Sequence, residues 1–180
     1  MLFSPFPTLE TERLMLREIM LSDQDDLFAM RADPRMHVYT DTTPDQHVEQ
    51  TSAYIEHMRK GVAENRWIIW AIAHKGTNRV IGSVGIWNID EAKNTAELSY
   101  GIAPDYQGKG YMAEAMASAL DFAFQTMQLA ALEAYTEADN APSRKLLEGF
   151  HFAEVDRVDD PSADGKRVYH MIVYRLERPE

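Results

Sequence analysis

The sequence predicts a mixed α+β fold in which helices flank a mostly antiparallel, twisted sheet. Its first half contains short apolar runs separated by turn residues, a pattern typical of hairpins. Its second half contains a strand, a glycine-rich turn, a helix and another strand, which is the order of a β-α-β crossover with one parallel strand pair. The chain has 180 residues, 45% of them hydrophobic, enough for one compact core. We therefore expect a single domain over residues 1–180.

The first half begins with a strand and continues with two helices and a hairpin. Residues 13–17 alternate polar and apolar side chains as a strand does. Ser22 opens a capping-box-like sequence for a helix that extends to Arg31, and the proline-containing segment 33–45 is a loop. Residues 48–62 carry apolar side chains at helical spacing. The β-branched and aromatic runs 67–73 and 80–89 flank a turn at 75–78, which predicts the hairpin.

The second half alternates strands with helices. A strand around Leu98 follows the turn at 91–94. The next helix carries one apolar stripe, formed by Met116, Leu120, Phe124 and Met127. Residues 132–136 form a further strand, and Asn140 opens a short helix that ends at Gly149. Two closing strands, 151–158 and 167–176, are joined by an acidic turn at 159–165.

Composition excludes several classes of function. The chain contains no cysteine, so it has no disulfide, no thiolate metal site and no cysteine nucleophile. The net charge of -11 argues against a nucleic-acid partner, because binding to phosphates requires clustered Lys and Arg. The six histidines lack the spacing of metal ligands, so no metal is expected. No leader-like segment and no membrane-length apolar run is present, which predicts a cytoplasmic protein that does not enter a membrane.

The turn containing Gly108 and Gly110 is the most informative segment. Two glycines let the backbone approach a ligand closely, and the first turn of the following helix leaves N–H groups unpaired, which predicts a phosphate or pyrophosphate site. The pattern G-x-G-x-x-A at 108–113 also occurs in dinucleotide folds, but residues 104–107 separate the strand from the first glycine and hairpins precede it. A nucleotide hydrolase is disfavoured because Gly108-Lys109 is not followed by a hydroxyl that holds magnesium.

The segment Gln107-Gly-Lys-Gly-Tyr-Met112 resembles the acetyl-coenzyme A loop, Q/R-x-x-G-x-G/A, of the GNAT superfamily of N-acetyltransferases. Thr11-Glu-Arg-Leu-Met-Leu-Arg17 and Asn140-Ala-Pro-Ser-Arg-Lys-Leu-Leu-Glu-Gly-Phe150 occur in the same order as in that family. These two segments look most like the branch of RimJ/RimL-type ribosomal-protein N-terminal acetyltransferases. The resemblance spans nearly the whole chain and implies a sheet whose parallel strand pair is splayed.

The resemblance implies that acetyl-coenzyme A (acetyl-CoA) is the acetyl donor. Amides of the glycine loop would hold its pyrophosphate, and its pantetheine arm would add to the splayed strand by main-chain bonding. Met112 replaces the usual small residue, so its side chain must point away from the phosphates. The implied cofactor contacts are Ile102, Gln107, Gly108, Lys109, Gly110, Tyr111, Met112, Asn140 and Ser143.

The resemblance also suggests two catalytic residues. Glu97 matches a glutamate position of the related branch and is the candidate general base, although a strand-face glutamate paired with a cation is an alternative interpretation. Ser143 is the candidate proton donor to the departing thiolate, although it could serve only as the third residue of a helix capped by Asn140. Many family members carry a tyrosine where this chain has Leu147, which is why Ser143 is considered as its replacement. Tyr100 and Tyr106 lie near enough in sequence to be alternative acids. Because cysteine is absent, we expect direct attack on the thioester, whose carbonyl a backbone N–H of Ile102 or Ala103 would polarise.

We expect the acceptor to be a primary amine, with the N-terminal α-amine of a protein or peptide favoured. The pKa of an α-amine is about 8 and that of lysine about 10.4, so the α-amine is deprotonated more easily. A small-molecule amine (a polyamine, an amino sugar or an antibiotic) and a non-catalytic acetyl-CoA sensor are the alternatives. The sequence leaves monomer and homodimer open. A negative rim that attracts a basic protein N-terminus is suggested by Asp33, Asp41, Asp45, Asp156, Asp159, Asp160 and Asp164.

Overall fold

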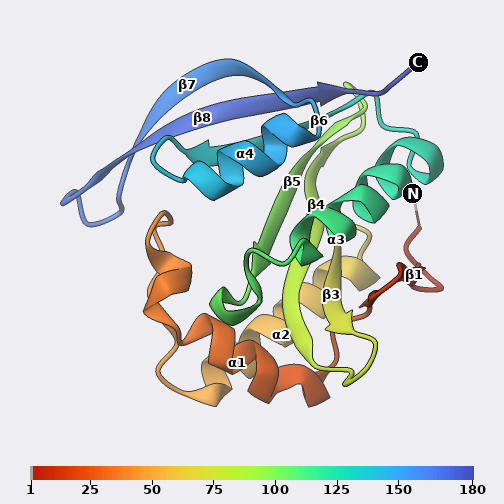
Figure 1. Ribbon diagram of the computed structural model, residues 1–180, viewed down its shortest axis with the longest axis vertical. Coiled ribbons are helices and arrows are strands. Elements are labelled where there is room, and N and C mark those ends of the chain that lie inside the picture. Colours follow the sequence, from red (N-terminus) through yellow and green to blue (C-terminus); the bar gives the residue numbers. More distant parts are fainter. Residues whose placement is uncertain (1) are drawn as a thin grey trace.

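The computed structural model describes residues 2–180, and its strands form one eight-stranded sheet (Figure 1). The strand order is β1-β2-β3-β4-β5-β6-β8-β7. All neighbouring strands are antiparallel except β5 and β6, which are parallel. The strands are β1 (Leu9–Glu10), β2 (Leu14–Arg17), β3 (Ile68–His74), β4 (Val80–Asp90), β5 (Thr95–Ile102), β6 (Ala131–Glu137), β7 (Ala153–Pro161) and β8 (Val168–Glu177). The predicted mixed α+β class is confirmed.

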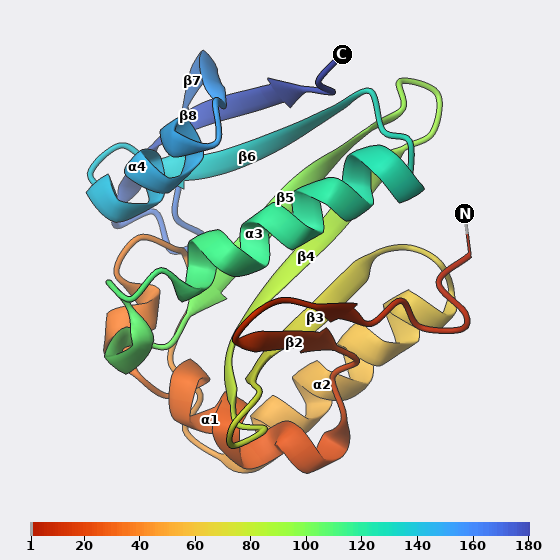
Figure 2. The same cartoon turned by 45° about the vertical axis from the view of Figure 1, so that its right-hand side comes forward.

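Four helices cover the two faces of the sheet (Figure 2). They are α1 (Gln24–Arg31), α2 (Val48–Ala63), α3 (Tyr111–Asp121) and α4 (Ala141–Gly149). The side chains of α3 and α4 pack into one hydrophobic core, and those of α1 and α2 pack into a second core on the opposite face. No helix within residues 2–180 is long and apolar enough to cross a membrane.

Strand β3 divides these two cores because successive side chains of a strand point to opposite faces. Ile68, Trp70 and Ile72 are buried in the core beneath α3. Ile69 and Ala71 are buried in the core beneath α1 and α2. A strand buried on both faces reads as a continuous apolar run, which explains the sequence of 68–73.

The structure corrects three details of the sequence prediction. Strand β7 extends to Pro161, so Asp159 and Asp160 lie in the ladder with β8 and not in the turn. Proline is tolerated at the end of an edge strand, because no ladder hydrogen bond is needed from it there. The helix after the glycine loop continues into a π-helical segment, Phe122–Thr126. The short strand β1 was not predicted, since two residues carry no periodic signal.

Candidate active site

The glycine turn connects the end of β5 to the start of α3. Gly108 and Gly110 have φ angles of 74° and 80°, a left-handed conformation that residues with side chains rarely adopt. A Cβ on Gly108 would have no heavy atom within 4 Å, so the loop leaves open space there. Gly110 is the N-cap of α3, and its carbonyl accepts from the Glu114 N–H. The N–H groups of the first turn, at residues 111–113, precede the first such bond and are available to an anion.

The predicted loop residues have different environments. Lys109 is exposed, and its Nζ lies 5.6 Å from the centre of the Tyr106 ring. Met112 packs against the core under α3, so its side chain is directed away from the open side of the loop. Gln107 donates from Nε2 to the Ile102 carbonyl at 3.3 Å. This contact ties the glycine loop to the end of β5.

Glu114 fixes the start of α3 to the N-terminal segment, a role that the sequence analysis missed. Its carboxylate accepts from Thr11 Oγ1 at 2.5 Å, from Arg13 Nε at 2.7 Å and from the Arg13 N–H at 2.9 Å. Arg13 also donates from Nη1 to the Lys109 carbonyl at 3.0 Å. Burial raises the pKa of Glu114, but the hydrogen bonds from Thr11 and Arg13 outweigh burial and hold this pKa below its ordinary value. The partners are about a hundred residues apart, so no local pattern reveals them.

Strands β5 and β6 separate after three paired positions. Thr95 pairs with Ala131, Ala96 with Leu132 and Glu97 with Glu133, and no pairing follows. Both strands continue beyond this point, β5 to Ile102 and β6 to Glu137. Figure 1 shows them diverging towards the end of β5 that leads into the glycine loop. The facing backbone groups of β5 are thus left without a strand partner, an arrangement that fits an extended ligand added between the strands.

The direction of the β5 backbone groups identifies which of them face this gap. The Ala103 N–H donates to the Ile81 carbonyl of β4 at 2.7 Å, so it is not available to polarise a bound thioester, contrary to expectation. Because N–H groups alternate between the two edges of a strand, the N–H of Ile102 points to the β6 side. Ile102 is thereby placed to bond a ligand in the gap.

Ser143 meets Tyr100 where α4 approaches β5. Their hydroxyl oxygens are 2.5 Å apart. Asn140 caps α4, and its Oδ1 accepts from the Ser143 N–H at 3.3 Å. Burial raises the pKa of Tyr100 to about 12, so this phenol keeps its proton at neutral pH. Leu147, at the position where many family members have a tyrosine, is fully buried in the core. Tyr100, weighed from sequence only as an alternative acid, is therefore the phenol paired with Ser143.

Glu97 lies on the opposite face of β5 from Tyr100, because the two residues are three positions apart and an odd spacing reverses the face of a strand. Its Oε1 accepts from Asn88 Nδ2 at 2.8 Å. It stands across from Trp87 of β4 in the ladder and forms the last parallel pair with Glu133 of β6. No cation pairs with Glu97 among residues 2–180, so the interpretation of an ion-paired glutamate is not supported. A ligand that reached both Glu97 and Ser143 would have to pass through the sheet where the two strands diverge.

Two loops far apart in sequence meet on the Glu97 side of the site. A Cβ on Gly101, which shares that face, would lie 3.5 Å from Met36 Cε of the first loop. The second loop is the turn between β7 and β8. Two hydrogen bonds join the loops: Ala163 N–H to Asp41 Oδ2 (2.9 Å) and Arg167 Nη1 to the Val38 carbonyl (2.9 Å). A third ties the first loop to β8, from the Tyr169 hydroxyl to the Thr40 carbonyl (3.1 Å).

The negative rim predicted from the sequence is reduced in the structure, because several of its carboxylates are buried or bonded to cationic side chains. Asp45 is buried and accepts from Arg31 Nε at 2.7 Å and from Thr51 Oγ1 at 2.8 Å. Asp33 is paired with Arg35 at 2.7 Å. Asp159 accepts from His170 Nδ1 at 2.8 Å and thereby raises the pKa of this imidazole. Within residues 2–180, no group of three or more His, Asp or Glu side chains is arranged to hold a metal ion.

Comparison with known proteins identifies the family. The family model "Acetyltransferase (GNAT) domain" matches residues 13–153. The chain belongs to the GNAT acetyltransferase family. This GNAT protein is 32% identical over 173 residues to "Uncharacterized N-acetyltransferase p20" of Bacillus licheniformis, covering 96% of this chain and 97% of the relative. It is 28% identical over 138 residues to the "Spermidine N(1)-acetyltransferase" of Vibrio cholerae, covering 73% and 77% of the two chains.

Solved structures share the fold of this GNAT chain. A putative ribosomal-protein-serine acetyltransferase from Vibrio cholerae matches with a TM-score of 0.84 and 23% identity, covering 96% of this chain and 98% of the other. Mycobacterium smegmatis RimJ in complex with CoA-disulfide matches with a TM-score of 0.84 and 21% identity, covering 95% and 87%. The GNAT chain is accordingly an acetyl-CoA-dependent N-acetyltransferase, and the alternative of a non-catalytic sensor is set aside.

Proposed function

We propose that this GNAT enzyme acetylates the N-terminal α-amine of a protein or peptide. The observation that carries the proposal is the position of Glu97, on a sheet face that helices leave open next to the splayed strands. Trp87 and Tyr135, on β4 and β6, are each 45% exposed. Trp87 lies across from Glu97, and Glu97 contributes to raising the pKa of Tyr135, after burial. An open, acidic and aromatic surface of this kind suits a cationic chain terminus.

Acetyl-CoA fits the residues on the other side of the sheet. The open space at Gly108 and the free N–H groups at the start of α3 suit the pyrophosphate. The N–H of Ile102 suits the pantetheine amides in the gap. Lys109 is exposed and adds only a screened positive charge, while Asn140 acts on the site by holding α4 and Ser143. Acetyl-CoA supplies an activated acyl group whose carbonyl carbon accepts the nitrogen.

The two proposed catalytic groups move protons on opposite faces. Glu97 accepts the proton of the acceptor ammonium through a water molecule, which leaves a neutral nitrogen to form the new C–N bond. When the C–S bond breaks, Ser143 donates its hydroxyl proton to the departing thiolate. Tyr100, hydrogen-bonded to Ser143 and protonated because of its high pKa, returns a proton to the serine. After the C–N bond forms, the nitrogen loses its second proton to water, and Glu97 returns the first proton to solvent. Tyr100 is reprotonated from solvent, so each turnover releases one proton overall.

The names of similar proteins point to two kinds of acceptor. One solved neighbour is described as a ribosomal-protein-serine acetyltransferase, and one relative as a spermidine acetyltransferase. The broad open face and the lower pKa of α-amines favour a polypeptide terminus. The opposing consideration is that a polyamine is also cationic and would be attracted to the same acidic face.

A thiol-release assay over a panel of acceptors tests the proposal. The panel contains peptides with a free N-terminus, the same peptides with a blocked N-terminus and an internal lysine, spermidine, and amino sugars. We expect the highest kcat/KM with a free N-terminus and a loss of at least about tenfold when it is blocked. Equal rates for free and blocked peptides, or a higher kcat/KM for spermidine than for every peptide, would overturn the choice of acceptor.

A further inference from the structure

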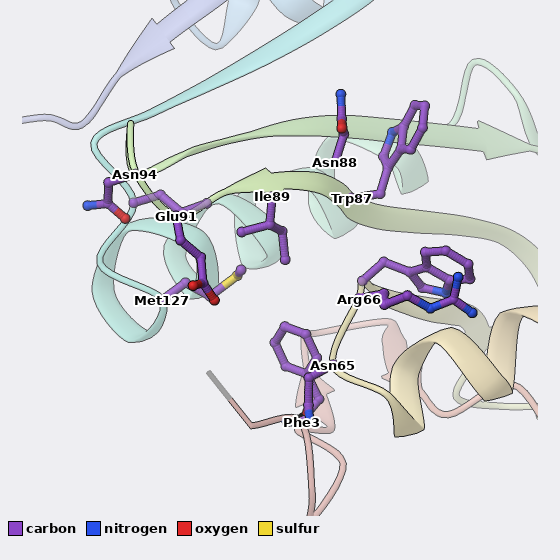
Figure 3. Close-up of a pocket in the computed structure, with 11 residues that line it drawn as sticks. Phe3, Asn65, Arg66, Trp87, Asn88, Ile89, Glu91, Asn94 and Met127 are labelled. Atoms are coloured by element: carbon purple, nitrogen blue, oxygen red, sulfur yellow. Dashed lines mark hydrogen bonds between the residues drawn. The ribbon is translucent and has the colours of Figure 1, made fainter.

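A hollow lies at the end of the sheet far from the glycine loop. Its volume is about 560 Å³, within the size range of small-molecule sites. It is lined by the end of β4 with the turn that follows it, the segment between α2 and β3, the N-terminal segment and the residues that follow α3 (Figure 3). The glycine loop begins at the opposite end of β5, whose eight residues span roughly 26 Å. The acetyl-CoA site proposed above therefore does not include this hollow.

The walls of this hollow combine apolar and aromatic side chains with polar ones. Phe3, Ile89 and Met127 provide apolar surface from three separate segments of the chain. Trp67 and Trp87 add two indole rings. Trp67 is anchored because its Nε1 donates to the Met58 carbonyl at 3.0 Å. Trp87 is 45% exposed, so much of its ring remains accessible to a ligand.

The charge of the hollow is negative. Arg66 is its one cationic wall residue, but this guanidinium pairs with Glu64 at 2.8 Å and lies 4.6 Å from the centre of the Trp67 ring. Glu91 is its one carboxylate, and within residues 2–180 no hydrogen bond or ion pair engages it. Figure 3 shows the Glu91 carboxylate directed into the hollow, towards Met127 and Phe3. The neighbouring Lys93 lies 3.8 Å from Asp90.

We propose that this hollow binds an organic cation with an apolar body, such as an aryl-alkyl ammonium. The apolar body would pack against Phe3, Ile89 and Met127. The cationic head would lie beside Glu91 and the ring of Trp87, because the Arg66 guanidinium already occupies a face of the Trp67 ring. Cations are attracted to the faces of aromatic rings, and Trp is the strongest partner. An organic anion would instead bring its charge next to an unpaired carboxylate. Trp87 also belongs to the acceptor face proposed above, whereas Glu91 does not, so Glu91 is the residue that distinguishes this site from acceptor binding.

A ligand in the hollow would also affect Glu97, the candidate general base. Asn88 lines the hollow and donates to Glu97 at 2.8 Å. The ladder between β4 and β5 is irregular between Trp87 and Asp90, so this segment is held by fewer strand pairs than the rest of β4. A ligand packed against this segment would therefore shift the position of Asn88, whose side chain orients Glu97.

Binding can be tested with three probes that share a phenyl ring and differ in charge: trimethyl(2-phenylethyl)ammonium, 2-phenylethanol and 3-phenylpropionate. The quaternary cation cannot be acetylated, so it cannot report on the acceptor site as a substrate. Indole N–H resonances of the three tryptophans locate the binding. We expect the cation to shift Trp67 and Trp87 but not Trp70, which is fully buried with its Nε1 bonded to the Pro7 carbonyl at 2.7 Å.

We expect the cation to bind at least about tenfold more tightly than the carboxylate. Glu91→Gln should weaken the cation about fivefold and leave 2-phenylethanol unchanged, because about 1 kcal/mol is typical of one charge pair near a wet surface. Glu49→Gln, the same change on an exposed residue of α2, should alter neither affinity. Equal affinities for cation and carboxylate, shifts confined to other residues, or no effect of Glu91→Gln would each overturn the proposal.

Discussion

Glu97 and Ser143 are placed on opposite sides of the sheet by the geometry of a single strand. Tyr100, which contacts Ser143, is three residues from Glu97, and an odd separation in a strand reverses the face. The two proposed proton transfers would thereby be separated in space. A residue change on one face should leave the chemistry on the other face intact.

Replacing Glu97 tests the general base. Glu97→Gln keeps an oxygen that accepts from Asn88 but removes the basic group. We expect kcat to fall about 100-fold near pH 7, and the loss to shrink above pH about 8, where the acceptor amine is already neutral. Rates measured with one peptide from pH 6.5 to 9.5 provide the check. The control is Glu133→Gln, which changes the neighbouring carboxylate bonded by Arg175 at 3.0 Å, and should cost less than threefold. A flat loss across pH would contradict the assignment.

Ser143 and Tyr100 should act as one unit. Ser143→Ala and Tyr100→Phe are each expected to lower kcat about 10- to 100-fold, and the double variant little further, because both serve one proton transfer. The pKa of Tyr100 is about 12, so these losses should not vary between pH 7 and 10. Additive losses in the double variant would mean that the two hydroxyls act separately.

The raised pKa of Tyr100 also has a consequence for stability. The unfolded chain ionises this phenol near its ordinary value of 10, whereas the folded chain keeps the proton to about 12. Stability is therefore lost as pH rises from about 10 towards 12. Urea unfolding at pH 9 and 11 should show a smaller pH-dependent loss in Tyr100→Phe than in the wild type. Identical losses would argue against a buried, protonated phenol.

Glu114 should contribute to stability in its charged form. Glu114→Gln removes a charged acceptor shared by Thr11 and Arg13, and we expect the free energy of unfolding to fall by about 1–3 kcal/mol. Because the folded pKa lies below the unfolded one, this contribution is present above the ordinary pKa and is lost as pH falls through the folded value. Urea unfolding at pH 7 and pH 4 measures both effects. Asp121→Asn, an exposed change on the same helix, should stay within about 0.5 kcal/mol.

At the scale of elements, the glycine loop and α3 form one unit whose requirements can be separated. Gly108 needs a left-handed backbone but has space for a Cβ, whereas a Cβ on Gly110 would lie 3.4 Å from Arg13 Nη2. The left-handed backbone at these glycines is thus needed for the loop to fold, whereas the open space at Gly108 is needed for the ligand to bind.

Substitutions at the glycine loop distinguish these requirements. Gly108→Asn keeps access to the left-handed region, so folding should be retained, while the new side chain fills the space proposed for pyrophosphate. Acetyl-CoA should raise the melting temperature of the wild type, and this shift should largely disappear in Gly108→Asn and in Gly110→Val. ATP and nicotinamide dinucleotides should have little effect on any of them. A normal acetyl-CoA shift in both variants would contradict the loop assignment.

At the scale of the whole molecule, the net charge of -11 should favour basic acceptors. We expect a higher kcat/KM for basic than for neutral peptides at low salt, and a smaller difference at high salt, because exposed charges are screened beyond roughly 8 Å at physiological ionic strength. Asp156→Asn with Asp160→Asn, on β7, should reduce the preference. Asp25→Asn with Asp121→Asn changes the net charge equally elsewhere and should reduce it less. Equal effects of both pairs would mean that only net charge matters.

The sequence by itself determined the fold class, the order of most elements and the position of the glycine loop. Each of these depends on local signals. The alternation in 13–17 predicts a strand, the helical spacing in 48–62 predicts a helix, and two glycines before an amphipathic helix predict an anion site. Each of these signals lies within one short segment of the sequence, so it can be recognised without knowledge of the tertiary structure.

Only the tertiary structure decided which side chains meet. Tyr100 and Ser143 are 43 residues apart, and Arg13 and Glu114 are 101 residues apart. Asp45, which sequence suggested for a negative rim, is turned inwards by Arg31, and the hollow around Glu91 draws its walls from four segments. Contacts of this kind depend on strand register and helix packing, which arise from the whole core. Periodicity within one segment fixes the face on which a residue lies, but it does not fix which residue packs against that face.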